Sequence, residues 1–353
     1  MVGETTRASV LVMPDRGFPQ AFPPRPRGNS YVVVELGYAL SSEELGPIDL
    51  VQNAARAERV GFGFALVSDH FHPWLDVQGE SPFVWNIIGA ISEATETLAI
   101  GTGVTCPLIR THPAVIAQAA ATSAALMPGR FFLGVGTGEN LNEHVLGDRW
   151  PAHEERLEML EEAIALMREL WQGGLVSHRG RHYTVDRARL YTLPEEPVPV
   201  AIAASGPDAA ELAGRIGDAF LSTAPDDELV RAFHEAGGDG KPCYGQLTVC
   251  YAEDRDEAIR TAFEQWPNAG LSGGLGQELA LPAHYRDACE TLTPDQVAEK
   301  VVCGPDPDEH HAAIAEFEQA GFSRVYVHQI GRDQDPFFAF YEREILPALH
   351  PVP

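Results

Sequence analysis

Lysine is scarce in this chain, because Lys241 and Lys300 are the only two among 353 residues. Arginine does not make up the difference: 25 basic residues face 51 acidic ones, and the formal net charge is −26. A field of this sign repels nucleic acids and anionic membrane surfaces. We therefore expect neither as a partner, and expect an anionic substrate to bind only where a local cationic pocket offsets the field.

Long apolar runs and paired cysteines are also missing. No segment approaches the roughly 20 apolar residues of a membrane-spanning helix, and no signal-peptide pattern opens the chain. The five cysteines are scattered and include no CxxC pair, so neither a disulfide framework nor a zinc site is supported. These features favour a reducing cytoplasm. Residues 1–30 are rich in proline and arginine and are expected to form an extension outside the fold.

From residue 31 to 353 the sequence alternates short apolar runs with amphipathic stretches of helical periodicity. Several of these stretches have proline in the first turn and glycine near the end. This alternation is typical of a parallel sheet, and about eight strands close a barrel. We predict a single (β/α)8 TIM barrel, with excursions at 175–193 and 267–294 that build or cover the site. The expected strands lie within 31–38, 62–69, 98–105, 130–138, 198–205, 218–224, 244–251 and 324–331.

In parallel barrels the active site forms at the carboxyl ends of the strands. The second expected strand is followed by Asp69, His70 and Trp74. His70 is the candidate acid–base group because imidazole titrates near neutral pH; alternatively it pairs with Asp69 or a backbone carbonyl and only holds the loop. Trp74 on its own is more often a core residue. A metal site at Asp69, His70 and His72 is disfavoured, because adjacent strand residues point to opposite faces.

Three further strand ends carry small and polar residues. The third strand ends in Thr102, Gly103, Thr105 and Cys106. The fourth ends in GTGENLNE at 136–143, where glycines would let a flat ring approach the backbone and Glu139 and Asn142 supply an acid and an amide; a plain strand–helix turn is the alternative. The fifth is followed by ASGPDAA at 204–210, whose free N–H groups at an expected helix start suit a phosphate.

These motifs in this order resemble the luciferase-like barrel superfamily, and within it the coenzyme F420-dependent glucose-6-phosphate dehydrogenase family. The matching stretches run from Tyr31 almost to the end and include VSDHFHPW, IGTGVTCP, FFLGVGTGENLNE and VPVAIAASGPDAAELAGRIGDAF. The resemblance implies a luciferase-like barrel, a deazaflavin cofactor and a homodimer. It also implies that His70 takes the proton of a substrate hydroxyl, that Trp74 stacks over the reacting centre, and that Glu139 handles the proton at the ring nitrogen.

The resemblance assigns binding residues as well. Gly103–Val104 falls where the family has a non-proline cis peptide. The implied cofactor contacts are Asp69, Gly103, Val104, Cys106, Thr137, Gly138, Asn142, Ser205, Gly206, Asp208 and Ala209. The implied substrate contacts are Thr223, Asp226, Arg286 and Lys300.

The phosphate-gripping positions depart from the family pattern. Asp226 stands where the family has a lysine, and Lys300 replaces an arginine. A carboxylate repels a phosphate, and one missing charge-assisted contact costs about 1.5 to 3 kcal/mol. We therefore predict a neutral alcohol or sugar lactol as substrate. The alternatives are a sugar-phosphate dehydrogenase with a rebuilt phosphate site, an FMN-dependent monooxygenase on the same barrel, and a cofactor-binding barrel without catalysis.

Overall fold

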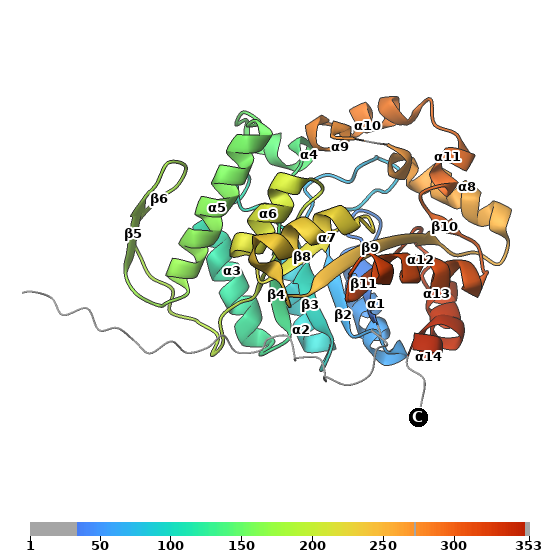
Figure 1. Ribbon diagram of the computed structural model, residues 1–353, viewed down its shortest axis with the longest axis horizontal. Helices are drawn as coiled ribbons and strands as arrows, with labels where there is room; N and C mark the ends of the chain where they lie inside the picture. Colours follow the sequence, from blue (N-terminus) through green and yellow to red (C-terminus); the bar gives the residue numbers. More distant parts are fainter. Residues whose placement is uncertain (1–33, 272, 350–353) are drawn as a thin grey trace, which may run out of the picture.

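The structure is a computed structural model that describes residues 34–271 and 273–349. The expected extension at residues 1–30 lies outside these ranges. Eight parallel strands close a barrel, because β11 pairs with β1 and β8 pairs with β9 (Figure 1). This confirms the predicted (β/α)8 barrel. The strands are β1 (Glu35–Leu40), β2 (Phe64–Val67), β3 (Ala99–Thr102), β4 (Phe131–Val135), β7 (Val200–Ala203), β8 (Ala219–Ser222), β9 (Cys243–Cys250) and β11 (Arg324–Gln329).

Helices return the chain between the strands and cover the outside of the barrel (Figure 1). Helix α1 shows why they form where they do. It begins with Pro47, whose fixed φ suits a first turn, and ends at Gly61, whose φ of 106° favours glycine. The main helices are α1 (Pro47–Val60), α2 (Val84–Ala94), α3 (Pro113–Leu126), α5 (His153–Leu170), α6 (Pro207–Ile216), α7 (Asp227–Phe233), α8 (Arg255–Gln265), α12 (Pro307–Gln319) and α13 (Asp335–Phe340).

Aromatic rings fill the interior of the barrel. The ring of Tyr244 lies 5.2 Å from those of both Phe64 and Phe132. Glycine on the neighbouring strand makes the room: a Cβ on Gly37 would fall 2.4 Å from Phe64, and one on Gly101 would fall 2.3 Å from Phe132. The interior is therefore a packed plug, and the space for chemistry lies above it, at the carboxyl ends of the strands.

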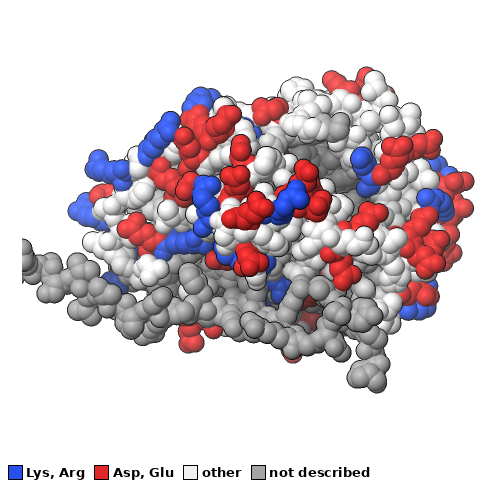
Figure 2. All heavy atoms as spheres, in the orientation of Figure 1, with Lys and Arg blue, Asp and Glu red and all other residues white. Residues whose placement is uncertain are grey.

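The first excursion is a hairpin, formed by β5 (Val176–Arg179) and β6 (Thr184–Ala188). It packs beside the acidic helix α5, where His178 lies 3.0 Å from Glu162 and Arg181 pairs with Glu158. Figure 2 shows acidic side chains over much of the visible face and basic ones gathered on the side of this hairpin. The arginines of the hairpin thus balance the charge of α5.

The second excursion covers the barrel mouth, as predicted. It contains α9 (Leu275–Glu278), α10 (Pro282–Cys289) and α11 (Pro294–Ala298), and the short strand β10 (Val302–Cys303) follows it. In Figure 1, α9 and α10 lie beside α4 (Asn140–Glu143), which follows β4. The side-chain amide of Asn140 donates to the carbonyl of Glu278 at 3.0 Å, and the ring of Tyr285 lies 5.3 Å from that of Trp74.

Two further features concern membrane-spanning helices and the cysteines. Within residues 34–271 and 273–349, no helix is long and apolar enough to cross a membrane. All five cysteines lie in these ranges, and each is a buried free thiol.

Candidate active site

The acid–base candidate His70 is held at both ring nitrogens. Its Nδ1 lies 3.1 Å from the carbonyl oxygen of His72, and its Nε2 lies 3.3 Å from Oε1 of Glu43. A neutral imidazole carries one N–H, yet both nitrogens face acceptors. The pair therefore has a place for a further proton, on the ring or on Glu43. This arrangement can take up and release a proton at the barrel mouth.

Glu43, which sequence reasoning did not single out, comes from the loop after β1. It is only 3% exposed and accepts a hydrogen bond from the Ser68 hydroxyl at 2.7 Å. Burial by itself would raise the pKa of Glu43, but His70 and the Ser68 hydroxyl outweigh it, and the pKa lies below its ordinary value. Glu43 is thus a carboxylate beside the imidazole. The rule that pointed to the other strand ends, applied to the first, would have found it.

The side chain of Asp69 points away from that of His70. Its Oδ1 accepts from the guanidinium of Arg110 at 2.8 Å, and its Oδ2 accepts from the hydroxyl of Thr105 at 2.8 Å. The side chains of Asp69 and His70 therefore bind different neighbouring loops, as the alternation of directions at a strand end requires. Asp69 anchors the loop after β3, and its carboxylate oxygens are both engaged.

Arg110 is the second residue of the site that sequence reasoning missed. It is largely buried, and besides Asp69 it reaches Oε1 of Glu143 at 3.5 Å while its backbone N–H donates to Oε2 at 2.8 Å. Burial raises the pKa of Glu143 above its ordinary value despite Arg110. No motif marks Arg110, because its partners follow other strands.

Trp74 and His70 are brought together. Their rings lie 4.8 Å apart, and Tyr285 from the second excursion packs against the other part of the indole. Trp74 is partly buried and packs against two hydrophobic clusters. It therefore supports the core and also borders the imidazole.

The glycine-rich turn after β4 joins two other loops. Gly138 has a φ of 73°, and a Cβ there would lie 2.5 Å from the sulfur of Cys106. Asn142 accepts the backbone N–H of Phe71 at 2.9 Å and that of His72 at 3.2 Å through Oδ1. Its amide nitrogen lies 3.5 Å from Oε2 of Glu139. Asn142 thus fixes the loop that carries His70, and the turn does more than connect a strand to a helix.

The floor of the mouth is built from small residues. The peptide bond between Gly103 and Val104 is cis, as the resemblance implied. Val104 packs on the aromatic plug, and a Cβ on Gly136 would lie 3.0 Å from it. Thr137 and Cys106 adjoin this floor in sequence and are buried. A flat floor without projecting side chains is suited to a planar ring.

The start of α6 lies open. Gly206 is its N-cap, and a Cβ there would meet nothing within 4 Å. Ser205 and Asp208 on either side are exposed, whereas Ala209 is buried. The first N–H groups of a helix are free to donate and favour an anion, so this end remains the predicted place for a phosphate. Within the described ranges, no group of three His, Cys, Asp or Glu side chains could hold a metal ion.

The four predicted substrate residues are not gathered into a cationic grip. Asp226 is the N-cap of α7 and accepts the N–H groups of Glu228 at 3.0 Å and Leu229 at 3.1 Å. Arg286 is exposed and pairs with Asp287 at 2.8 Å. Lys300 and Thr223 are exposed, on the loops after α11 and β8. Asp226 thus has a local structural role, because it satisfies free N–H groups of its helix.

The closed parallel barrel carries an imidazole–carboxylate pair at the carboxyl ends of its strands. Barrel enzymes have their active sites at this end. Residues 31–324 match the family model described as luciferase-like monooxygenase. The chain belongs to this family.

Individual relatives and solved structures show more specific similarities than the family model. The chain is 38% identical over 331 residues to an F420-dependent glucose-6-phosphate dehydrogenase of Microbacterium testaceum, covering 90% of this chain and 98% of that one. A relative of the same name from Mycobacterium avium is 37% identical over 331 residues, with the same coverage. Among solved structures, an F420-dependent secondary alcohol dehydrogenase in complex with an F420–acetone adduct superposes with a TM-score of 0.83 at 30% identity, covering 90% of this chain and 99% of that one.

Proposed function

We propose that this protein is a coenzyme F420-dependent oxidoreductase that moves a hydride between the deazaflavin and the carbon of an alcohol, lactol or carbonyl group. The observation that carries the proposal is the buried His70–Glu43 pair, at 3.3 Å, beside Trp74 in the barrel mouth. Removing hydride from an alcohol carbon leaves a hydroxyl proton, and an imidazole within reach of that hydroxyl can take it. The names of the relatives point to the same chemistry.

The residues present fit such a cofactor. A planar ring would lie over the cis Gly103–Val104 turn, beside Thr137, Gly138 and Cys106, and its phosphate would meet Ser205 and Gly206 at the start of α6. When bound, the deazaflavin accepts or returns the hydride. His70 exchanges the substrate proton, Trp74 limits the access of water to it, and Glu139, partly buried at the start of α4, exchanges the proton at the ring nitrogen.

We propose an uncharged substrate. The buried charges around the mouth are mostly carboxylates, including Glu43 and Glu143, and the cation Arg110 is already bound to Asp69. A phosphate would have to displace that pairing or reach the exposed Arg286 or Lys300. Unpaired charges of like sign in a site of low dielectric are strongly repulsive. The alternative substrate is a sugar phosphate whose phosphate is held by Arg286 or Lys300.

The proposal is tested by titrating the purified protein with F420 and, separately, with FMN, following intrinsic tryptophan fluorescence. Loss of deazaflavin absorbance is then followed with secondary alcohols, polyols and aldoses. We expect F420 to bind more tightly than FMN and uncharged substrates to reduce it. Preference for FMN, with consumption of oxygen, would instead indicate a monooxygenase.

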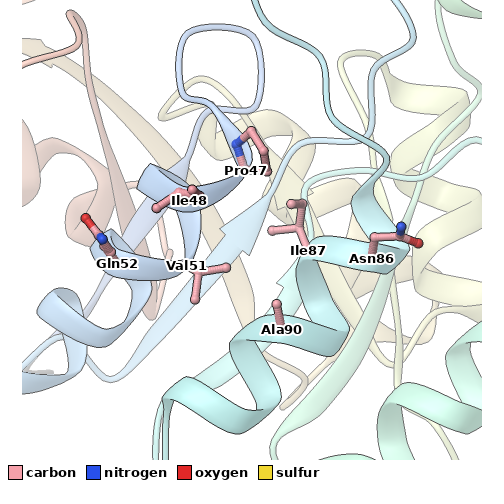
Figure 3. Close-up of a pocket in the computed structure, with 7 residues that line it drawn as sticks. All are labelled: Pro47, Ile48, Val51, Gln52, Asn86, Ile87 and Ala90. Atoms are coloured by element: carbon pink, nitrogen blue, oxygen red, sulfur yellow. The ribbon is translucent and has the colours of Figure 1, made fainter.

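We also propose that the chain forms a homodimer through the face of α1, α2 and α3. A groove of about 480 Å³ lies between α1 and α2. Figure 3 shows Val51 pointing toward Ile87 and Ala90 in this groove. Ile48 is 69% exposed beside it, and Val115 on α3 is 55% exposed. Helix α3 has no charged residue and α2 has one. Two copies that each carry a charge of −26 can approach more closely where acidic residues are few.

The dimer is tested by analytical ultracentrifugation of the wild type and of Ile48→Glu. We expect the wild type to sediment as a dimer and the variant to shift toward the monomer, because two buried carboxylates would face each other near the interface. A wild-type monomer at micromolar concentration would contradict the proposal. A cytoplasmic location is part of the same proposal, and the five free thiols support it.

A further inference from the structure

A chain of buried polar groups continues from His70 beyond Glu43. The hydroxyl oxygen of Ser41 lies 3.1 Å from Oε2 of Glu43 and 3.5 Å from Oε2 of Glu44. Glu44 lies 3.3 Å from Nε2 of His328 and also accepts a backbone N–H at 2.9 Å. Glu44 and His328 are each 2% exposed. Two adjacent carboxylates thus share one bridging hydroxyl, and each faces its own imidazole.

His328 lies in the same mouth as His70. It follows Tyr326 by two residues on β11, and Tyr326 belongs to the aromatic plug, so both side chains point inward. The groups packed around His328 are Glu44, at 3.3 Å, and the ring of Trp266, at 4.5 Å. Its Nδ1 has no hydrogen-bond partner within the described residues, so the N–H that the structure satisfies is the one at Nε2, which faces Glu44.

The chain of polar groups gives the proton that His70 takes up a place to go. The Nδ1 of His70 lies 3.1 Å from the carbonyl of His72, so Nε2, which lies 3.3 Å from Glu43, is the nitrogen that can take a proton, with Trp74 packed beside the ring. A proton taken from substrate at Nε2 must therefore move on before the ring can take another. Glu43 is the neighbour that can receive it, and the Ser41 hydroxyl is the connection from Glu43 to a second carboxylate.

We propose that Ser41 and Glu44 relay the proton that His70 exchanges with substrate, a role that rests on the hydride-transfer function proposed above. In oxidation the substrate O–H bond breaks and its proton goes to Nε2 of His70, while the C–H bond of the carbon that bears this oxygen would give its hydride to the bound cofactor. The proton passes to Glu43. Glu43 then donates a proton to the oxygen of Ser41. At the same time, the hydrogen that the Ser41 hydroxyl already carried passes to Oε2 of Glu44. Glu43 regains its charge, Glu44 becomes neutral, and reduction runs the same steps backward.

Glu44 and Ser41 are thus positioning residues that act through His70, and His328 keeps Glu44 ready to accept by donating from Nε2. The variants Glu44→Gln and Ser41→Ala test this. Glutamine keeps an oxygen for the backbone N–H but takes up no proton, and alanine removes the bridge. The matched control is Tyr341→Phe, which removes a hydrogen bond of 2.9 Å to the buried His310 between α12 and α13.

In steady-state oxidation with F420, we expect kcat of Glu44→Gln and Ser41→Ala to fall at least about tenfold, with KM and the Kd for F420 within about twofold of wild type. Added imidazole buffer should restore part of kcat, because a free base can take the proton from His70. Tyr341→Phe should keep kcat and show no response to imidazole. Unchanged kcat in Glu44→Gln, or joint loss of kcat and F420 affinity without rescue, would overturn the relay.

A second measurement tests the relay without substrate. In the protein labelled with ¹⁵N-histidine and free of cofactor, the pH titration of the His70 ring signals should shift in Glu44→Gln and stay unchanged in Tyr341→Phe, because coupled groups titrate as a unit. An identical His70 titration in Glu44→Gln would overturn the relay. A wild-type protein that turns over no tested alcohol contradicts the proposed function alone, and this titration then decides the relay.

Discussion

Glu43 and His70 come from the loops after the neighbouring strands β1 and β2, and their side chains meet at 3.3 Å with the carboxylate almost fully buried. The contact depends on the parallel pairing of β1 with β2, because parallel strands in register bring the two following loops to the same end of the barrel. It gives the imidazole a fixed orientation and an immediate partner for its proton.

Replacing Glu43 by glutamine should lower kcat by about 100-fold, the lower range for a lost acid–base partner. The Kd for F420 should stay near wild type, because the side chain faces His70 and Ser68. Stopped-flow reduction of F420 and a fluorescence titration measure the two quantities. Glu35→Gln is the control: this carboxylate lies at the opposite end of β1 and pairs with Arg324 at 2.7 Å, and kcat should not change. Equal losses in both variants would contradict a specific role for Glu43.

Asn142→Ala should destabilise the protein by about 1 to 3 kcal/mol, because two partly buried backbone N–H groups lose their acceptor. Its kcat should fall too, since the loop that carries His70 is released. The neighbouring Asn140→Ala removes only the 3.0 Å contact to Glu278 and should cost less than about 1 kcal/mol. Urea unfolding monitored by circular dichroism, together with kcat, compares the two variants. If Asn140→Ala proved the more harmful, the assignment of Asn142 as the anchor would be wrong.

Gly138→Ala should destabilise more than Gly147→Ala. Both glycines have positive φ, 73° and 87°, so each substitution carries the strain of a left-handed backbone, about 1 to 3 kcal/mol. Only at Gly138 would the new Cβ also lie 2.5 Å from Cys106, whereas nothing lies within 4 Å at Gly147. The difference in Tm therefore measures the clash at the floor of the mouth. We also expect weaker F420 binding in Gly138→Ala alone, and equal F420 affinity in both variants would argue against a cofactor at this turn.

Glu143→Gln should change how stability depends on pH. Burial raises the pKa of Glu143 in the folded state, so the folded protein binds its proton more tightly than the unfolded chain. The wild type therefore loses stability at this site as pH rises from the unfolded value, roughly 4.3, through the raised folded value. The glutamine variant lacks this loss, so its stability relative to wild type should increase from pH 4 to pH 7. Parallel stability curves, from urea unfolding at each pH, would mean that Arg110 cancels the effect of burial on the pKa of Glu143.

The sequence allowed the barrel to be predicted almost completely, because each strand is a continuous apolar run and each helix has its own start and stop residues. His70, Trp74 and the Gly103–Val104 turn could be located because they stand at strand ends inside recognisable motifs. Glu43, Glu44 and Arg110 escaped, since their importance comes from contacts between loops far apart in sequence. The local role of Asp226 as the N-cap of α7 was likewise not predicted from its place in the pattern.

The most direct test of the account is the rate at which the protein reduces F420 with glucose, with a simple secondary alcohol such as propan-2-ol, and with glucose 6-phosphate, at equal concentrations and fixed ionic strength. The account predicts turnover with at least one uncharged compound, and a kcat/KM for glucose 6-phosphate at least about tenfold lower, the equivalent of one lost charge-assisted contact. A higher kcat/KM for glucose 6-phosphate than for any uncharged compound would contradict it and would show that Arg286 or Lys300 rebuilds a phosphate site.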